Sequence, residues 1–313
     1  MAQRQRQRVL LVGASSGIAQ ILAPALAEDF DIFGIDSREY RWSEAFPGEF
    51  LRVGYTHRKL ADVFRKVSFD ALLHVGRISS LSEVSRKSRL EQNVYGTARL
   101  LRLGVNHGIK KMVVLGTHLV YGAAKEMPCY LREDDPLRAS EGYAELFDAI
   151  ELDLETRAFI YEHRGVNTVL LRPAHIIGAH SQFALSSLLQ KKYFPKLLGF
   201  DPLIQMIDER DVVRALILCL KKPLFGVFNV AGEGVLPLSK ALDLVGTLPV
   251  PIPLWAIPSI ARVMRLRGLR FPRHLVHYLK YPTIISDQKF REAVSWTPQY
   301  TVLETLKKLK EKV

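Results

Sequence analysis

The sequence predicts an α/β fold in which a parallel sheet is covered by helices on both faces. Three observations support this prediction. Strand-like and helix-like segments alternate through the first half of the chain, residues 9–19 form an apolar run that ends in a glycine turn, and a second apolar run ends in Asp36. Such alternation is typical of βαβ units, in which helices join parallel strands.

Six short apolar runs in the first 172 residues are expected to be strands: Val9–Val12, Asp31–Ile35, Phe50–Val53, Ala71–Val75, Met112–Gly116 and Thr168–Arg172. Four segments between them place apolar residues at helical spacing: Ile18–Ala27, Arg58–Lys66, Arg89–Asn106 and Tyr143–His163. A later helix, Asp211–Leu220, and a strand, Gly226–Val230, are expected to return to the same sheet.

The chain is expected to divide into two parts. Residues 1–172 and 210–231 would form a Rossmann-like, doubly wound parallel sheet. Residues 173–209 and 232–313 are richer in proline and in short helical patterns, which indicates a smaller, mostly helical part. No internal repeat or low-complexity linker separates the two, so we expect them to interlock.

Composition places the chain among ordinary globular proteins. It has 313 residues, 48% hydrophobic and 24% charged, and no apolar run approaches the roughly 18 residues that span a bilayer. Arg4, Arg6 and Arg8 precede an apolar stretch, as in a secretory signal, but glycines and serines at 13–17 interrupt it. Cys129 and Cys219 lack zinc-like spacing, so we expect inert thiols, no metal site and a cytoplasmic location.

The formal net charge of +12 favours anionic partners. No Asp or Glu lies between Asp243 and Asp287, whereas residues 255–280 interleave apolar residues with six cations: Arg262, Arg265, Arg267, Arg270, Arg273 and Lys280. This basic stretch is consistent with a solvated helix face, with a diphosphate-binding element, or with peripheral contact to an acidic membrane. No recognition motif for nucleic acid occurs, so specific nucleic-acid binding is not expected.

The first glycine turn has the pattern of a phosphate-binding loop. Gly13 permits a sharp turn from strand to helix, and Gly17 lets the backbone approach a pyrophosphate at the helix N-terminus. Ser15 and Ser16 can donate to phosphate oxygens. Asp36 is spaced to accept hydrogen bonds from ribose hydroxyls, and its charge opposes a 2′-phosphate. We therefore expect NAD as cofactor, with NADP less favoured and dependent on Arg38.

Three further segments carry a family resemblance: Asn93–Thr97, Leu115–Gly122 and Leu170–Gly178. In this order and spacing the chain resembles the extended short-chain dehydrogenase/reductase (SDR) family, and within it the NAD-dependent sugar-nucleotide epimerase/dehydratase branch. The C-terminal segments 287–290 and 296–298 are similar to that branch as well. The resemblance runs nearly from end to end.

The resemblance implies a nicotinamide cofactor across the strand ends and a nucleotide sugar, or a similar anionic small molecule, in a cleft under the C-terminal, substrate-binding part. It implies catalytic roles for Thr117 and Tyr143, and a homodimer formed through helices 89–106 and 143–163. The residues it implies around the cofactor are Gly13, Ser15, Ser16, Gly17, Ile18, Asp36, Ser37, Arg38, Val75, Gly76, Arg77, Asn93, Gly116, Thr117, Tyr143, Pro173, His175 and Ile176.

The sequence departs from the family at Phe147, where relatives carry a lysine four residues after the tyrosine. A free tyrosine titrates near ~10, and a nearby ammonium favours its phenolate. Phenylalanine supplies no such charge, so it cannot lower the pKa of Tyr143 as that lysine would. Arg77, His118 and the Tyr121–Lys125 pair are candidate substitutes. Gly54 stands where relatives have an aspartate that contacts adenine.

Three functions fit these residues. The first is an NAD-dependent epimerase/dehydratase-like oxidoreductase that acts on a hydroxyl of a nucleotide sugar. The second is a catalytically degenerate NAD(P)-binding sensor, which Phe147 favours. The third is a dehydrogenase of an apolar, sterol- or isoprenoid-like alcohol, which the apolar and basic stretch 255–280 favours.

Overall fold

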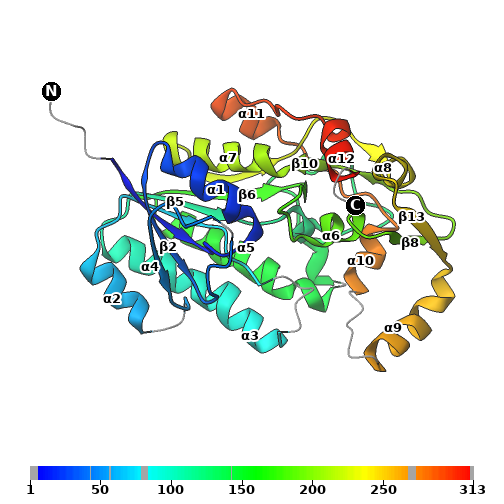
Figure 1. The fold of residues 1–313 in the computed structure, drawn as a ribbon, viewed down its shortest axis with the longest axis horizontal. Helices are drawn as coiled ribbons and strands as arrows, with labels where there is room; N and C mark the ends of the chain where they lie inside the picture. The colour runs from blue at the N-terminus through cyan, green and yellow to red at the C-terminus, as the bar shows by residue number, and fades with distance from the viewer. Residues whose placement is uncertain are drawn as a thin grey trace.

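The computed structural model describes residues 6–42, 44–55, 58–78, 84–141, 143–266 and 273–310. A parallel seven-stranded sheet lies at its centre, with the strand order β11-β6-β5-β4-β1-β2-β3 (Figure 1). The strands are β1 (Arg8–Val12), β2 (Asp31–Asp36), β3 (Glu49–Arg52), β4 (Ala71–His74), β5 (Lys111–Leu115), β6 (Asn167–Pro173) and β11 (Gly226–Val230). The expected α/β fold with a doubly wound parallel sheet is confirmed.

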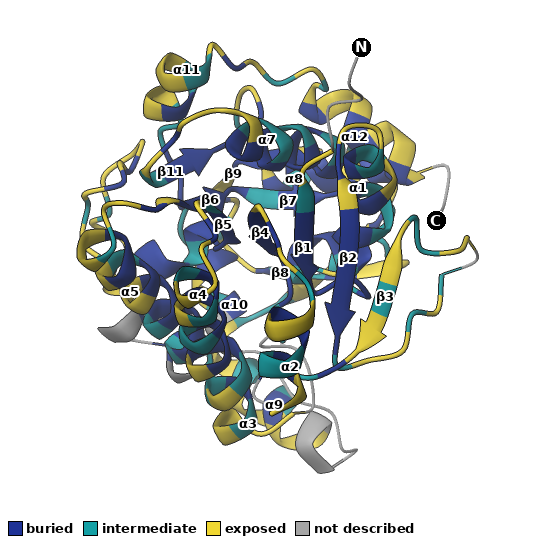
Figure 2. Ribbon diagram, turned by 90° about the vertical axis from the view of Figure 1, so that its left-hand side faces the viewer, coloured by how far each residue is buried: buried dark blue, intermediate teal, exposed yellow. Residues whose placement is uncertain are grey.

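The central strands are apolar because both of their faces are covered. Val9 and Leu11 of β1 belong to one apolar core, and the alternate residues Leu10 and Val12 belong to the other. This alternation follows from the two-residue period of a strand. Figure 2 shows the buried inner strands between layers of helices whose outer faces are exposed.

Helices cover the two faces in two groups. On one face α1 (Gly17–Ala27) packs against α7 (Glu209–Lys221). On the other face α4 (Thr97–Asn106) packs against α2 (Lys59–Lys66) and α5 (Phe147–Glu162). The sheet's strand order reverses between β1 and β4, and α/β proteins bind ligands outside the carboxyl ends of the strands at such a reversal.

Two predicted helices differ from the structure. The helix expected over 89–106 is interrupted: α3 (Arg86–Leu90) is followed by a π-helical turn, η1 (Glu91–Gly96), before α4 begins. The helix expected over 143–163 begins later, because Tyr143 precedes a 3₁₀ turn, η4 (Ala144–Leu146), and α5 starts at Phe147. Tyr143 and Phe147 are therefore not one turn apart on a single α-helix.

The second part is built from short elements, many of them paired strands. Three two-stranded sheets pair β10 with β7, β12 with β9 and β13 with β8. Their bounds are β7 (His175–Ile177), β8 (Tyr193–Leu197), β9 (Leu203–Ile204), β10 (Met206–Asp208), β12 (Leu236–Pro237) and β13 (Leu248–Ile252). The helices are α6 (Ala184–Leu189), α8 (Leu238–Val245), α9 (Ile257–Leu266), α10 (Arg273–Tyr278), α11 (Gln288–Val294) and α12 (Val302–Lys310).

This part has an apolar core of its own, which includes Phe194, Leu242 and Leu306. Phe290 of α11 and Trp296 nevertheless pack into the core of the main sheet, where the Phe290 ring lies 5.9 Å from that of Phe228. The two parts therefore share apolar packing.

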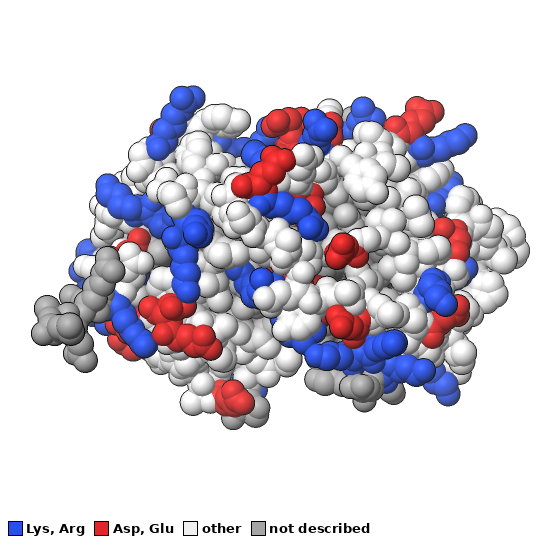
Figure 3. Space-filling model, turned by 90° about the horizontal axis from the view of Figure 1, so that it is seen from above, with Lys and Arg blue, Asp and Glu red and all other residues white. Residues whose placement is uncertain are grey.

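No helix in the described segments has the length and apolar character needed to cross a bilayer. Figure 3 shows one face of the molecule, on which Lys and Arg side chains are interspersed with Asp and Glu. Arg267 and Arg270 of the basic stretch lie outside the described residues.

Candidate active site

The turn between β1 and α1 is enclosed so tightly that two of its positions require glycine. Gly13 has a φ of +89°, and a Cβ on it would lie 2.2 Å from the Cα of Gly76. A Cβ on Gly17 would lie 2.0 Å from the carbonyl oxygen of His180. Both neighbours are backbone atoms, which cannot swing aside as a flexible side chain can. Larger residues would therefore displace the backbone at the start of α1.

Two buried hydroxyl oxygens at the start of α1, Ser15 Oγ and Ser16 Oγ, have no hydrogen-bond partner in the described structure. Ser16 is the N-cap of α1, yet its side chain does not cap the helix. Ile18 is buried in the first turn. Buried polar groups are normally paired, and a helix N-terminus attracts anions. The start of α1 therefore suits a phosphate group, which could accept from both hydroxyls and from free backbone N–H groups.

Asp36, at the end of β2, is buried and fully hydrogen-bonded. Its Oδ2 accepts from the Ser15 backbone N–H at 3.0 Å and from Arg38 Nη2 at 3.1 Å. Its Oδ1 accepts from the backbone N–H and the Nε of Arg38 at 2.9 and 3.1 Å. A carboxylate offers about four acceptor positions, and all four are in use here. Three are taken by Arg38, so they are not available to the hydroxyls of a ribose.

The Arg38 side chain is half-exposed, whereas Asp36 is buried. Arg38 can therefore leave the carboxylate without crossing packed atoms. Ser37 lies between them, and its carbonyl oxygen accepts a hydrogen bond from Arg52 Nε at 3.3 Å. Asp36, which was expected to accept from the ribose, is thus paired with Arg38, on which NADP binding was expected to depend.

The segment after β4 passes close beneath the glycine turn. The backbone N–H groups of Val75 and Gly76 both donate to the Val12 carbonyl, at 2.9 and 3.1 Å. A Cβ on Gly76 would lie 2.1 Å from the Tyr55 hydroxyl oxygen. Asn93, in the π-turn, accepts from the Ile78 N–H and donates to its carbonyl oxygen. The Asn93 amide thus clamps the segment that contains Arg77.

Two arginines and one carboxylate lie together beside Asn93. Asn93 Nδ2 donates to Asp148 Oδ2, and Arg89 Nη2 lies 3.7 Å from Asp148 Oδ1. Arg77 interacts electrostatically with both Asp148 and Arg89, and its burial lowers its pKa. Arg77 Nη1 and two nitrogens of Arg89, Nε and Nη1, are buried without a hydrogen-bond acceptor in the described structure. The cluster therefore has donors left for a further anionic or carbonyl group.

Phe147 is the first residue of α5, and a cation lies over the face of its ring. The guanidinium carbon of Arg86, on α3, lies 4.6 Å from the Phe147 ring centroid. Such a contact is attractive because the ring face is electronegative. A positive charge thus lies beside Phe147, although it comes from another helix.

Gly116 and Thr117 follow the end of β5. The Gly116 N–H donates to the Leu171 carbonyl at 2.8 Å and so ties the segment to β6. Thr117 is buried, and its hydroxyl oxygen accepts from the Leu119 N–H at 3.3 Å. The Thr117 side chain is therefore oriented by the 3₁₀ turn η2 (His118–Tyr121).

The Tyr143 hydroxyl is engaged by the backbone. It donates to the Ala123 carbonyl at 2.7 Å, and its ring centroid lies 4.9 Å from that of His277 and 5.7 Å from that of Tyr278. Burial raises the pKa of Tyr143, so its phenolate is less accessible than that of a free tyrosine. Tyr143 must release Ala123 before it can exchange a proton with a ligand.

His118 and His175 form a close pair at the ends of β5 and β6. Their ring centroids lie 4.3 Å apart at 82°. His118 Nδ1 lies 2.9 Å from the Pro173 carbonyl, which can only accept, so Nδ1 carries the proton. Burial lowers the pKa of His118 to about 4. Its buried Nε2 has no partner in the described structure and is left as an acceptor. The neighbouring Ile176 is buried in β7.

Tyr121 belongs to the packed interior rather than to an open site. Its hydroxyl donates to Asn229 Oδ1 at 2.8 Å and accepts from Arg172 Nη1 at 2.7 Å. Arg172 in turn forms a buried ion pair with Asp153. Burial raises the pKa of Tyr121 to about 12. The Tyr121–Lys125 pair is therefore a poor substitute for the missing tyrosine–lysine pair.

Sequence reasoning did not single out Arg86, Arg89 or Asp148. Two signals were present: Asp148 directly follows Phe147, and Arg86 lies three residues before Arg89, where a helix was predicted to begin. Among the described residues, no group of three or more His, Cys, Asp or Glu side chains could hold a metal ion.

A family model described as "NAD dependent epimerase/dehydratase family" matches residues 9–231. An uncharacterized protein from Mycobacterium tuberculosis is 27% identical over 263 residues, which cover 82% of this chain and 69% of that protein. UDP-glucose 4-epimerase 2 of Arabidopsis thaliana is 30% identical over 131 residues, which cover 39% of this chain and 34% of that enzyme.

Solved structures share the fold at low sequence identity. UDP-glucose 4-epimerase from Thermotoga maritima, solved with UDP-glucose, superposes with a TM-score of 0.76 at 17% identity, covering 97% of this chain and 98% of that one. dTDP-glucose 4,6-dehydratase from Bacillus anthracis, solved with NAD, gives 0.75 at 15% identity, covering 98% and 96%. The match to the family model spans most of the chain and includes the glycine turn, Asp36 and Thr117, and by it the chain belongs to the NAD dependent epimerase/dehydratase family.

Proposed function

We propose that this protein binds NAD and acts as an epimerase/dehydratase-like oxidoreductase on a hydroxyl of a nucleotide sugar. The observation that carries the proposal is the start of α1, where two buried, unpartnered hydroxyls face an anion-attracting helix N-terminus. Asp36 lies within hydrogen-bond distance of that turn through the Ser15 N–H. This arrangement fits the pyrophosphate and ribose of a dinucleotide.

In this proposal, Ser15 and Ser16 donate to the pyrophosphate, and Asp36 receives the ribose hydroxyls after Arg38 has moved away. NAD, when bound, supplies a hydride acceptor and donor. Thr117 orients the reacting hydroxyl of the sugar, and Tyr143 exchanges a proton with it after releasing Ala123. The cations Arg77, Arg86 and Arg89 favour negative charge near the first turn of α5 and partly replace the missing lysine.

Two further observations support the ligand class and the assembly. Curated relatives and solved structures include UDP-glucose 4-epimerases, and the net charge of +12 suits an anionic ligand. Tyr95, Leu154 and Tyr161 are exposed on η1 and α5, where the family resemblance implies a homodimer interface. We therefore propose residues 173–209 and 232–313 as the substrate-binding part and a dimer as the working assembly.

Isothermal titration calorimetry with NAD, followed by turnover assays on UDP- and dTDP-sugars, tests this function. Asp36→Ala should weaken NAD binding by about tenfold or more, since a charge-assisted hydrogen bond contributes roughly 1.5–3 kcal/mol. Tyr143→Phe should abolish turnover while NAD still binds. If no heat is detected with NAD or NADH, the proposal is wrong.

A second candidate function is an NAD sensor without turnover. It is favoured by the Tyr143 hydroxyl, which is bonded to Ala123 and has a raised pKa with no lysine on α5 to lower it. Stabilisation by NAD in a thermal-unfolding assay, combined with no conversion of any nucleotide sugar, would select this function over the first.

A further inference from the structure

The strand β13 is apolar on both faces although it is exposed. Its sequence is Leu-Pro-Val-Pro-Ile, and its first four residues are exposed, with Leu248 at 52% and Val250 at 43% of full accessibility. An exposed strand normally alternates apolar with polar residues. The second part of the molecule therefore presents an apolar strand that nothing in the described structure covers.

The outer edge of β13 cannot pair with another strand. The Leu248 N–H donates to the Lys192 carbonyl, and the Ile252 carbonyl accepts from Leu198, so residues 248 and 252 face β8. Along a parallel strand the backbone groups of alternate residues point to the same edge. The backbone groups of Pro249 and Pro251 therefore point away from β8. Proline has no N–H, so this edge cannot accept an added strand. An occupant must make non-directional apolar contact instead.

The chain that follows β13 exposes further apolar side chains. Leu254 and Trp255, in the 3₁₀ turn η5 (Leu254–Ala256), are exposed, and Trp255 is 81% accessible. Val263 on α9 is 50% accessible. Figure 1 shows α9 at the lower right, set apart from the main sheet. We define the docking face as Leu198, Leu248, Val250, Leu254, Trp255 and Val263.

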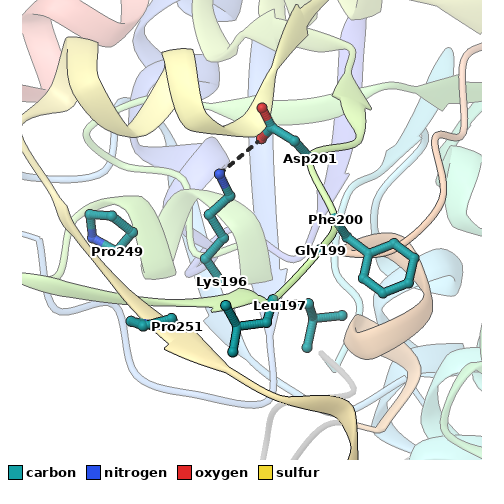
Figure 4. Close-up of a pocket in the computed structure, with 8 residues that line it drawn as sticks. Lys196, Leu197, Gly199, Phe200, Asp201, Pro249 and Pro251 are labelled. Atoms are coloured by element: carbon teal, nitrogen blue, oxygen red, sulfur yellow. Dashed lines mark ion pairs between the residues drawn. The ribbon is translucent and has the colours of Figure 1, made fainter.

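A cleft of about 510 Å³ adjoins the docking face, between the β8 end and β13. Its walls include Leu197, Phe200 and the two prolines of β13 (Figure 4). Asp201 is the one acidic residue that lines it, and its carboxylate pairs with Lys196 at 3.3 Å. The cleft is therefore apolar, and its acidic group is neutralised.

The charges around the docking face are basic. Lys191 and Lys192 are exposed beside β8, and Arg262 is exposed next to Val263 on α9. Lys280 Nζ lies 5.1 Å from the Phe200 ring centroid at the cleft. The chain has no Asp or Glu between Asp243 and Asp287. Exposed tryptophan and aliphatic side chains flanked by cations are what an interfacial segment needs to bind acidic lipid.

We propose that the docking face binds peripherally to an anionic lipid bilayer. Trp255, Leu254 and Val263 enter the headgroup region, while Arg262, Lys191 and Lys192 attract the negative surface. The docking face lies in the part proposed to bind substrate, but it contains none of the residues assigned to the cofactor or to catalysis, so the proposal can be tested without NAD or turnover.

Co-sedimentation of the full chain with vesicles tests the proposal. Binding is expected to phosphatidylcholine vesicles that contain phosphatidylglycerol and not to phosphatidylcholine alone, and it should weaken as salt is raised. Arg262→Glu should weaken binding by about tenfold, because each cation near an acidic surface contributes several-fold. Trp255→Ser should weaken it as well, and Trp255 fluorescence should shift to the blue on binding.

Matched changes elsewhere serve as controls. Arg164→Glu makes the same charge change at an exposed position on another part of the chain, and Tyr130→Ser removes an exposed aromatic ring. Both variants should bind vesicles as the unmodified protein does, and circular dichroism should report the same fold for all variants. The proposal is overturned if acidic vesicles are not bound. It is also overturned if Arg262→Glu and Arg164→Glu weaken binding equally, or if Trp255→Ser changes the oligomeric state but not vesicle binding.

Discussion

The start of α1 and the start of α5 differ in how they are prepared for a ligand. At α1, the buried hydroxyls of Ser15 and Ser16 have no partner among the described residues, and the backbone leaves no room for a side chain at Gly13 or Gly17. At α5, the Tyr143 hydroxyl already donates to the Ala123 carbonyl, and Phe147 is an apolar residue with Arg86 over its ring.

The start of α1 concerns binding of the cofactor, and the start of α5 concerns catalysis. At the α1 end the Arg38 side chain has to leave Asp36, whereas at the α5 end the hydrogen bond from Tyr143 to Ala123 has to break and the pKa of Tyr143 has to fall. Catalysis through Tyr143 therefore requires that its pKa, which burial raises, be lowered when ligands bind.

The largest effect is expected at the α1 end, from Gly17→Val. The new Cβ would lie 2.0 Å from the His180 carbonyl oxygen, and relief of such an overlap requires backbone movement that costs about 1–3 kcal/mol or more. NAD binding by calorimetry should be lost and the melting temperature lowered. Gly165→Ala is the control, since a Cβ there meets nothing within 4 Å. Equal NAD affinity in both variants would contradict the role of the turn.

The α5 end is tested by Phe147→Lys combined with Arg86→Gln. The second change removes the guanidinium that lies over the Phe147 ring and would repel the new ammonium. Because burial raises the pKa of Tyr143, a lysine should lower it and move the rising limb of the pH–rate profile to lower pH. Turnover at neutral pH should increase by about 10²-fold. Phe147→Leu with Arg86→Gln controls for loss of the ring, and an unchanged profile would remove Tyr143 from the chemistry.

Most of the sheet could be predicted from sequence because its inner strands β1, β4, β5 and β6 are buried on both faces and are therefore short, largely apolar runs. The Gly226–Val230 strand was predicted with its observed bounds, and the other six sheet strands lie within one or two residues of theirs. The break at Glu91–Gly96 could not be predicted, since its residues keep helical spacing and the π-turn accommodates Asn93, which clamps a segment far away in sequence.

The candidate site was predictable where backbone geometry dictates residue type, as at Gly13, Gly17 and Asp36. Contacts that long side chains make between different helices and strands could not be predicted in the same way. Arg86 reaches Phe147 from another helix, and Arg38 folds back onto Asp36. Rotamers of arginine allow many such partners, so only the structure selects between them. The family-based spacing also assumed one helix over residues 143–163, whereas Tyr143 lies before α5.

His118, next to Thr117 at the end of β5, gives a smaller effect that can be measured without any ligand. Its pKa of about 4 in the folded state lies below the ~6.5 of an unfolded histidine. Between these values the unfolded chain binds a proton that the folded chain does not, so stability falls as pH is lowered from 7 to 5, by about 2 kcal/mol for this group. Urea unfolding at both pH values should show a loss smaller by that amount in His118→Gln. Equal losses would mean that His118 is already accessible to protons.

The smallest effect is expected from Arg38→Ala, which tests whether Arg38 competes with NAD for Asp36 at the α1 end. The Arg38 fork fills both oxygens of Asp36 and offsets the charge that opposes a 2′-phosphate. Because the arginine side chain is half-exposed, its ion pair contributes less than about 1 kcal/mol. Its removal should tighten NAD binding by about threefold and weaken NADP binding by a similar factor. Arg41→Ala, which removes an exposed arginine paired with Glu39, should change neither affinity. If Arg38→Ala instead weakens NAD binding, the guanidinium holds the dinucleotide directly and Asp36 alone does not select it.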